Sequence, residues 1–177
     1  MVAAVPEEDW GRPAPCSEWT VRRVLNRARI DQQAYGLVLR AGRPGEDPFR
    51  LADALHGGPL AELDKVLDAV ADACAGPPAD AGSVPAPLGL LPLPPAAGAG
   101  ALDAAVHAWD IAVATGRIRP LAPAPAAGLG PVADQLVPRL REYGVFAPAL
   151  ASDGPQGAAA SLLAFLGRGP EWAPPTA

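Results

Sequence analysis

Three residues that could carry acid–base or metal chemistry lie close together in one apolar segment: Asp103, His107 and Asp110. In a helix that turns about 100° per residue, these positions fall within an arc of about 60° and project from one stripe. A histidine between two carboxylates can act as an acid–base unit or supply ligands to a metal ion. The stripe could equally be the solvent-facing edge of an amphipathic helix.

Two ligands do not complete a metal site, because zinc normally takes at least three from the protein. His56, beside Gly57-Gly58, and Cys16 are candidates for a third ligand, with water as another. Each has an ordinary alternative, since a loop histidine is usually exposed and a lone cysteine is usually a small buried residue. Cys16 and Cys74 lie far apart without a CxxC pair, which argues against a disulfide scaffold or a cysteine-based zinc site.

Helical periodicity predicts the elements that must position these residues. Val21, Val24, Leu25 and Ala28 follow the spacing of one buried helix face. No stretch shows a convincing β-strand alternation, and no internal repeat is visible, so we expect an all-α bundle in one domain, residues 1–177. The first expected helix runs from Thr20, as N-cap, to about Arg40, and the second spans Asp47–Cys74 with a bend at Gly57-Gly58-Pro59. A Pro/Gly connector over 76–100 separates them from a third helix, Ala101–Thr115, which Gly116 caps. Two further helices are expected, Val132–Tyr143 with a kink at Pro138, and Ser161–Leu166.

Composition narrows the function classes. The chain has 177 residues, of which 50% are hydrophobic and 19% charged, with a formal net charge of −5. An acidic chain lacks the basic surface that phosphate binding needs, so nucleic acid is not an expected partner. The longest uncharged run, 81–102, carries five prolines and does not predict a membrane span. The apolar start before Pro6 is too short for a secretion signal, and we expect a cytoplasmic protein.

Three sequence blocks carry a family resemblance. The segment 13–26, PAPCSEWTVRRVLN, resembles the opening of the mycothiol-dependent maleylpyruvate isomerase N-terminal-like proteins of the DinB-like superfamily. The segment 101–116 is similar to their second hallmark, D-x-x-x-H-x-W-D-x-A-x-A-T-G, and 162–172 is similar to the ending of small actinobacterial members. The blocks occur in the family's order, which makes the resemblance specific for the family but not for a reaction.

The resemblance implies a four-helix bundle with a divalent metal near one end. Two of its three ligands map onto Asp103 and His107, and the third would be a histidine after Asn26, where this chain has Arg27. A guanidinium is always cationic and has no lone pair to donate, so it cannot be a ligand. We expect Arg27 to point inward, replace the metal as a permanent cation, bridge to Asp103 and leave His107 as a free imidazole. The alternative is a decayed site with Arg27 reaching water.

The resemblance also concerns the start of the chain. Family members usually carry several more helical turns before Val2, so we expect a truncated first helix or a sequence that begins at an internal methionine. A missing helix would expose core surface, which a ligand or a second copy of the chain, forming a homodimer, could cover.

These observations predict a small-molecule enzyme that works without metal. His107 would be the general acid or base, oriented by Asp103 or Asp110, and Arg27 would anchor an anionic substrate. Trp19 and Trp109 would form core or pocket wall. The resemblance implies isomerisation or thiol-adduct chemistry with mycothiol as a candidate cosubstrate, and a tailoring step of secondary metabolism is equally compatible. A small carboxylate or enol would suit an arginine.

Two alternatives stay open. The chain could be a non-catalytic ligand-binding or accessory protein with a degenerate metal site, in which Asp103 and His107 only pair with Arg27. It could also be a metal-dependent, mycothiol-linked isomerase or transferase that holds zinc or nickel through Asp103, His107 and a substitute ligand. In the first case His107→Ala should change only affinity or stability, and in the second the protein should contain metal.

Overall fold

Helix α1 (Val21–Leu39) begins where the sequence predicts it. The side chain of Thr20 accepts a hydrogen bond from the backbone N–H of Arg23 at 3.2 Å, which satisfies one of the free donors of the first turn. Val21, Val24 and Leu25 are fully buried, as their helical spacing indicates. The predicted N-cap and the predicted core face of this helix are therefore confirmed.

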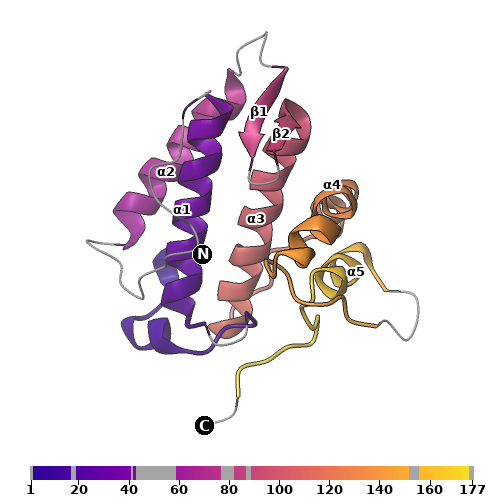
Figure 1. Cartoon of the computed structure of the whole chain (residues 1–177). Helices are drawn as coiled ribbons and strands as arrows, with labels where there is room; N and C mark the ends of the chain where they lie inside the picture. The colour runs from indigo at the N-terminus through magenta and orange to yellow at the C-terminus, as the bar shows by residue number, and fades with distance from the viewer. Residues whose placement is uncertain are drawn as a thin grey trace.

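The computed structural model describes residues 2–16, 19–40, 42, 59–76, 82–86, 89–151 and 156–175. Over these residues the chain is mostly helical, as predicted, with one small antiparallel hairpin (Figure 1). After α1 the elements are α2 (Pro59–Ala75), β1 (Ser83–Ala86), β2 (Gly89–Pro92), α3 (Leu93–Ala114), α4 (Pro123–Glu142) and α5 (Ala158–Phe165), and two 3-10 turns, Val2–Ala4 and Glu7–Gly11, precede α1.

The connector predicted over 76–100 is wrong in two respects. Its middle forms the β1–β2 hairpin, in which Ser83 pairs with Pro92 and Ala86 with Gly89. Its end is already helix, because α3 begins at Leu93 rather than at Ala101. Prolines fit the first turn of a helix, where the N–H groups have no helical partner.

Helix α4 was likewise predicted too short. It begins at Pro123, nine positions before the expected Val132, and continues through Pro131 and Pro138. The kink expected at Pro138 stays a prediction. Of the expected second helix, Pro59–Ala75 is observed as α2, whereas 47–58 lies outside the described residues.

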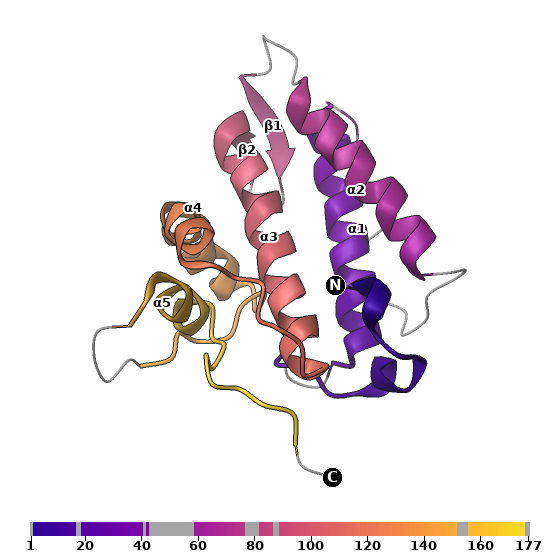
Figure 2. The ribbon, with the colours of Figure 1, turned by 180° about the vertical axis from the view of Figure 1, so that it is seen from behind.

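The helices form two groups on either side of α3. Helix α1 packs against α2 on one side and α3 on the other, while α4 and α5 pack together beyond α3 (Figure 2). One core cluster lies among α3, α4 and α5, and a second joins the N-terminal segment, α1 and the end of α3. Trp172, in the C-terminal segment, packs against both clusters.

Three helices end in the same way, with a glycine at positive φ: Gly116 after α3, Gly144 after α4 and Gly167 after α5. Each glycine N–H, and the N–H of the next residue, bonds back to carbonyls of the last helical turn, which is the Schellman arrangement. The predicted cap at Gly116 is confirmed. Among the helices of the described ranges, none is long and apolar enough to cross a membrane.

Candidate active site around His107

His107 lies between two carboxylates of its own helix. Its Nε2 is 3.4 Å from Asp103 Oδ1, one turn earlier, and its Nδ1 is 3.3 Å from Asp110 Oδ2, one turn later. The His107 residue is 9% exposed and the Asp110 side chain 0%. The stripe is therefore buried between helices and is not the solvent-facing edge of an amphipathic helix.

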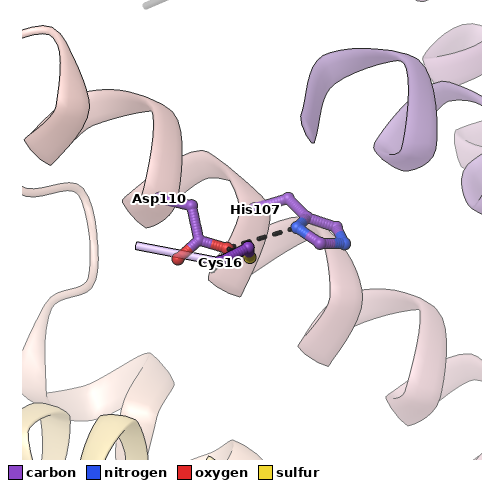
Figure 3. Close-up of side chains that lie close together, drawn as sticks. All are labelled: Cys16, His107 and Asp110. Atoms are coloured by element: carbon purple, nitrogen blue, oxygen red, sulfur yellow. Dashed lines mark hydrogen bonds and ion pairs between the residues drawn. The ribbon is translucent and has the colours of Figure 1, made fainter. Parts of the chain in front are cut away.

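Asp110 also binds a residue of the C-terminal segment. Arg168 donates from Nε to Asp110 Oδ1 and from Nη2 to Asp110 Oδ2, both at 2.9 Å, a two-point ion pair. The thiol of Cys16 lies 3.1 Å from Asp110 Oδ2 and 3.2 Å from Arg168 Nη2. Figure 3 shows Cys16, His107 and Asp110 gathered at one point of α3.

Local turns bring Cys16 and Arg168 to this point from opposite ends of the chain. Near the N-terminus, Ala14 N–H donates to Trp19 O at 2.9 Å and Trp19 N–H donates to Cys16 O at 3.1 Å. After α5, Gly167 turns the chain at φ +77°, and the backbone N–H of Arg168 returns to Leu163 O at 2.9 Å. Both side chains are thus held by hydrogen-bonded backbone.

Helix α1 supplies the opposite wall. Gln32 Nε2 donates to Asp103 Oδ2 at 3.0 Å and to Gly100 O at 2.9 Å, which fixes the carboxylate that faces His107. Arg27 Nε forms an ion pair with Asp31 Oδ2 one turn later on α1. Single ligand atoms of Asp31, Asp103 and His107 lie within 4.8 Å of one another, so the two helices form one polar cluster.

Charge favours a protonated His107 in this cluster. Burial disfavours the imidazolium, but the charge of Asp103 and the hydrogen bonds to Asp103 and Asp110 raise the pKa of His107 well above 6.5. Burial likewise disfavours ionised Asp103, yet the charge of His107 and the hydrogen bonds of His107 and Gln32 lower the pKa of that carboxyl. These shifts favour an imidazolium paired with a carboxylate at neutral pH, rather than the free imidazole expected for His107.

The two remaining carboxylates differ sharply. Burial would raise the pKa of Asp110, but the charge of Arg168 and the hydrogen bonds from His107 and Arg168 lower it to about 2. Burial and the neighbouring charge of Asp103 raise the pKa of Asp31 to about 7, although Arg27 opposes this shift. Asp31 is thus the carboxyl of this cluster that exchanges a proton near neutral pH.

The structure places Arg27 facing inward, as expected, with its side chain 14% exposed. Its partner in this ion pair is Asp31, which the sequence analysis did not name, and the expected bridge to Asp103 stays a prediction. Asp31, Gln32 and Arg168 are site residues that the sequence did not predict. Asp31 carried a local signal, four positions after Arg27. Arg168 lies within the block 162–172 that carries the family resemblance, but its pairing with Asp110, 58 positions away, left no local pattern.

The predicted tryptophans lie in the cores. Trp109 is 1% exposed and packs among α3, α4 and α5. Trp19 packs against the N-terminal core, with the guanidinium of Arg23 5.2 Å from its ring centre. Their use as substrate-binding walls stays a prediction. His56 lies outside the described residues.

The metal ion implied by the resemblance would meet both suitable donors and neighbouring cations in this cluster. Two sets of three donors converge, Cys16 with His107 and Asp110, and Asp31 with Asp103 and His107. Each set contains a carboxylate held by a guanidinium, Asp110 by Arg168 and Asp31 by Arg27. A divalent ion would stand beside that permanent charge and be repelled.

The charges of this cluster also balance without a further cation. Three carboxylates, Asp31, Asp103 and Asp110, face three cations when His107 is protonated. Within the described residues, the two guanidiniums among these cations are the feature that weighs against a resident divalent ion.

Comparisons with known proteins agree with the sequence blocks. Residues 1–112 match the family described as the mycothiol maleylpyruvate isomerase N-terminal domain. Over 170 residues, 95% of this chain, the sequence is 31% identical to uncharacterized proteins of Mycobacterium tuberculosis strains CDC 1551 / Oshkosh and ATCC 25618 / H37Rv, covering 90% of each relative. No solved structure matches the chain.

Proposed function

We propose, since the chain belongs to the mycothiol maleylpyruvate isomerase N-terminal domain family of the DinB-like superfamily, that it is a small-molecule enzyme whose acid–base group is His107. The reaction class we assign is isomerisation of an unsaturated acid or formation of a thiol adduct. The protein would work without a metal ion, with Arg27 as the anchor for an anionic substrate.

One observation carries this proposal: the ring of His107 is sealed on one side and more open on the other. At Nδ1 it meets Asp110, whose side chain is 0% exposed. At Nε2 it meets Asp103, whose side chain is 15% exposed, on the side where the side chains of Arg27 and Asp31 are 14% and 11% exposed. A substrate would therefore approach from the Nε2 side.

This asymmetry suits a proton shuttle. The imidazolium donates its Nε2 proton to the substrate. The Nδ1–H stays on the ring and donates to Asp110, whose carboxylate stabilises the positive charge whenever the ring is protonated. Asp103, held by Gln32, orients the Nε2–H in the resting state. Asp31 adds a second group that can take up or release a proton near neutral pH.

Arg27 supplies the binding contact for the substrate. A guanidinium offers donors in a planar fork that matches a carboxylate or an enolate. Mycothiol, as cosubstrate, would supply a thiolate that adds to an activated double bond. The residues of this chain would then bind the acid group, orient it and protonate the carbon or oxygen that becomes negative.

The activity test uses maleylpyruvate as probe, with and without mycothiol, on protein treated with a chelator. We expect His107→Gln to lower turnover about 100- to 10,000-fold while the helical content is kept. Arg27→Lys should mainly raise KM, because the charge stays and the fork is lost. Arg29→Lys, on the same helix but bonded to Asn26 and Gln33, is the matched control and should change neither parameter.

The metal content of untagged protein distinguishes the metal-free mechanism from the metal-dependent alternative. The convergence of Asp31, Asp103 and His107 is the observation that favours that alternative. We expect less than stoichiometric zinc or nickel and no gain of activity on titration. Stoichiometric metal would overturn the metal-free mechanism. Binding of the acid without turnover would instead identify a ligand-binding protein.

A further inference from the structure

We infer that Arg168 is a positioning residue for His107, so that the C-terminal segment completes a site built mainly by the family domain. This inference rests on the proposed function for its use in catalysis. Its structural content, that Arg168 fixes the ring of His107 through Asp110, stands separately and has its own test.

The argument begins with the oxygens of Asp110. Oδ2 is shared by three groups, His107 Nδ1 at 3.3 Å, Cys16 Sγ at 3.1 Å and Arg168 Nη2 at 2.9 Å. Oδ1 is held by Arg168 Nε at 2.9 Å. Because the guanidinium is planar and grips both oxygens, it fixes the rotation of the carboxylate as well as its charge.

Arg168 is itself anchored at both ends. Its backbone N–H bonds to Leu163 O in the Schellman turn, and its Nη1 donates to Leu166 O at 3.3 Å. Leu166 is fully buried in the core among α3, α4 and α5. The guanidinium therefore has little freedom to follow a moving Asp110.

The consequence reaches the ring of His107. Because Oδ2 of Asp110 is fixed, the Nδ1–H of His107 donates in one direction only. The opposite ring nitrogen, Nε2, is then directed toward Asp103 and the more exposed side of the cluster. Arg168 lies outside residues 1–112, which match the family domain. The orientation of the proposed acid is thus set by a part of the chain beyond that match.

The test reads the Nδ1–H proton of His107 by NMR in the full-length protein. The chain has two histidines, and His56→Gln assigns the remaining ring signals. The rate of exchange of this proton with solvent is measured and compared with that of backbone amides in α3. The comparison separates local release of the ring from general loss of stability.

Arg168→Lys is the informative variant, because lysine keeps the charge but not the two-point grip. We expect ring-proton exchange to rise at least about tenfold while the α3 amides change by less than about twofold. Arg141→Lys is the matched control, since Arg141 also contacts α5, donating to Phe165 O at 2.6 Å, and it should leave the ring proton unchanged.

Three outcomes would overturn the inference: unchanged ring-proton exchange in folded Arg168→Lys, equal acceleration of ring and α3 amides, or the same effect in Arg141→Lys. If Arg168→Lys does not fold, Gly167→Ala serves instead. That variant keeps every side chain of the site and strains the turn that carries Arg168. If Gly167→Ala loses more stability than Gly144→Ala, which shows that the turn has moved, unchanged exchange also overturns the inference. A positive exchange result in a protein without turnover would leave positioning intact and contradict only the proposed function.

Discussion

Asp110 has no exposed surface and yet carries a charge. It accepts contacts from Arg168, His107 and Cys16, which together replace the water it lost. Such a carboxylate stabilises the folded protein only while it is ionised, because protonation removes its attraction for two cations. Asp110 should therefore contribute to the acid sensitivity of the protein, together with Asp103, whose pKa is also lowered.

The folded-state pKa of Asp110 is about 2, against 3.8 for the ordinary group. A lowered pKa means stability that is fully present above about pH 4 and is lost as the pH falls to about 2, here about 2 kcal/mol. Urea unfolding from pH 5 to pH 2 measures it. Asp110→Asn should flatten this acid limb, whereas Asp134→Asn, at an exposed position of α4, should keep it; equal slopes would contradict the assignment.

Arg27 should show the opposite pH dependence. Its removal leaves Asp31 with the raised pKa of a buried carboxyl next to Asp103, and a protonated Asp31 needs no cation. We expect Arg27→Ala to lose little stability below about pH 6, where Asp31 is protonated with or without Arg27, and to lose about 1 kcal/mol more for each pH unit above about 7, where Asp31 ionises in the wild type and stays protonated in the variant. Denaturant midpoints in these two pH ranges measure this difference, and a pH-independent loss would argue against the Arg27–Asp31 pair.

The residues also show what a sequence can reveal. Asp103, His107 and Asp110 could be predicted as one group because helical spacing fixes their direction, and Arg27 because it stands at a ligand position of the family. Arg168 could not, since its position depends on how α5 packs against α3, a long-range property. Asp31 could have been found from its position four residues after Arg27 on the same helix, a spacing at which opposite charges pair.

Among the elements, the glycine that ends α5 has the most specific task. A Cβ on Gly167 would lie 2.7 Å from Ala147 Cβ, and its φ is +77°. Gly144, at the same position after α4, has φ +73° and nothing within 4 Å. The two turns share a backbone conformation and differ in the space around it.

This difference gives a matched pair of variants. Gly144→Ala should cost about 1–2 kcal/mol, the penalty of a left-handed residue with a Cβ. Gly167→Ala should cost more, because the chain must also move away from Ala147. Thermal unfolding of both variants measures this, and equal losses would show that the close contact at Gly167 can relax freely.

The elements that the sequence failed to predict share one cause. Proline was taken as a sign of connector, although it is tolerated in a first helical turn and in a short two-stranded hairpin. Pro94 and Pro95 open α3, and Pro85 lies within β1. The C-terminal ends of helices were easier to predict, because a glycine after an apolar run usually caps a helix.

At the scale of the whole molecule, the site joins segments that are far apart in sequence. The Cys16–Asp110 contact spans 94 positions and the Arg168–Cys16 contact spans 152. These contacts connect the N-terminal segment and α3 with the segment after α5. The two helix groups on either side of α3 therefore share one polar junction, formed by Cys16, Asp110 and Arg168, and Trp172 packs against both cores.

Such separations have a kinetic consequence. Closing a long loop costs chain entropy before any contact forms, so contacts of this range tend to be absent from the folding transition state. We expect Cys16→Ala to accelerate unfolding about fivefold per kcal/mol lost, with little change in the folding rate. Thr20→Ala, which removes a cap spanning three positions, should slow folding instead. Stopped-flow measurements of both variants check this, and the reverse pattern would contradict it. The junction at His107 would then form last during folding and break first during unfolding. The rate at which it opens would therefore set how long each molecule stays native.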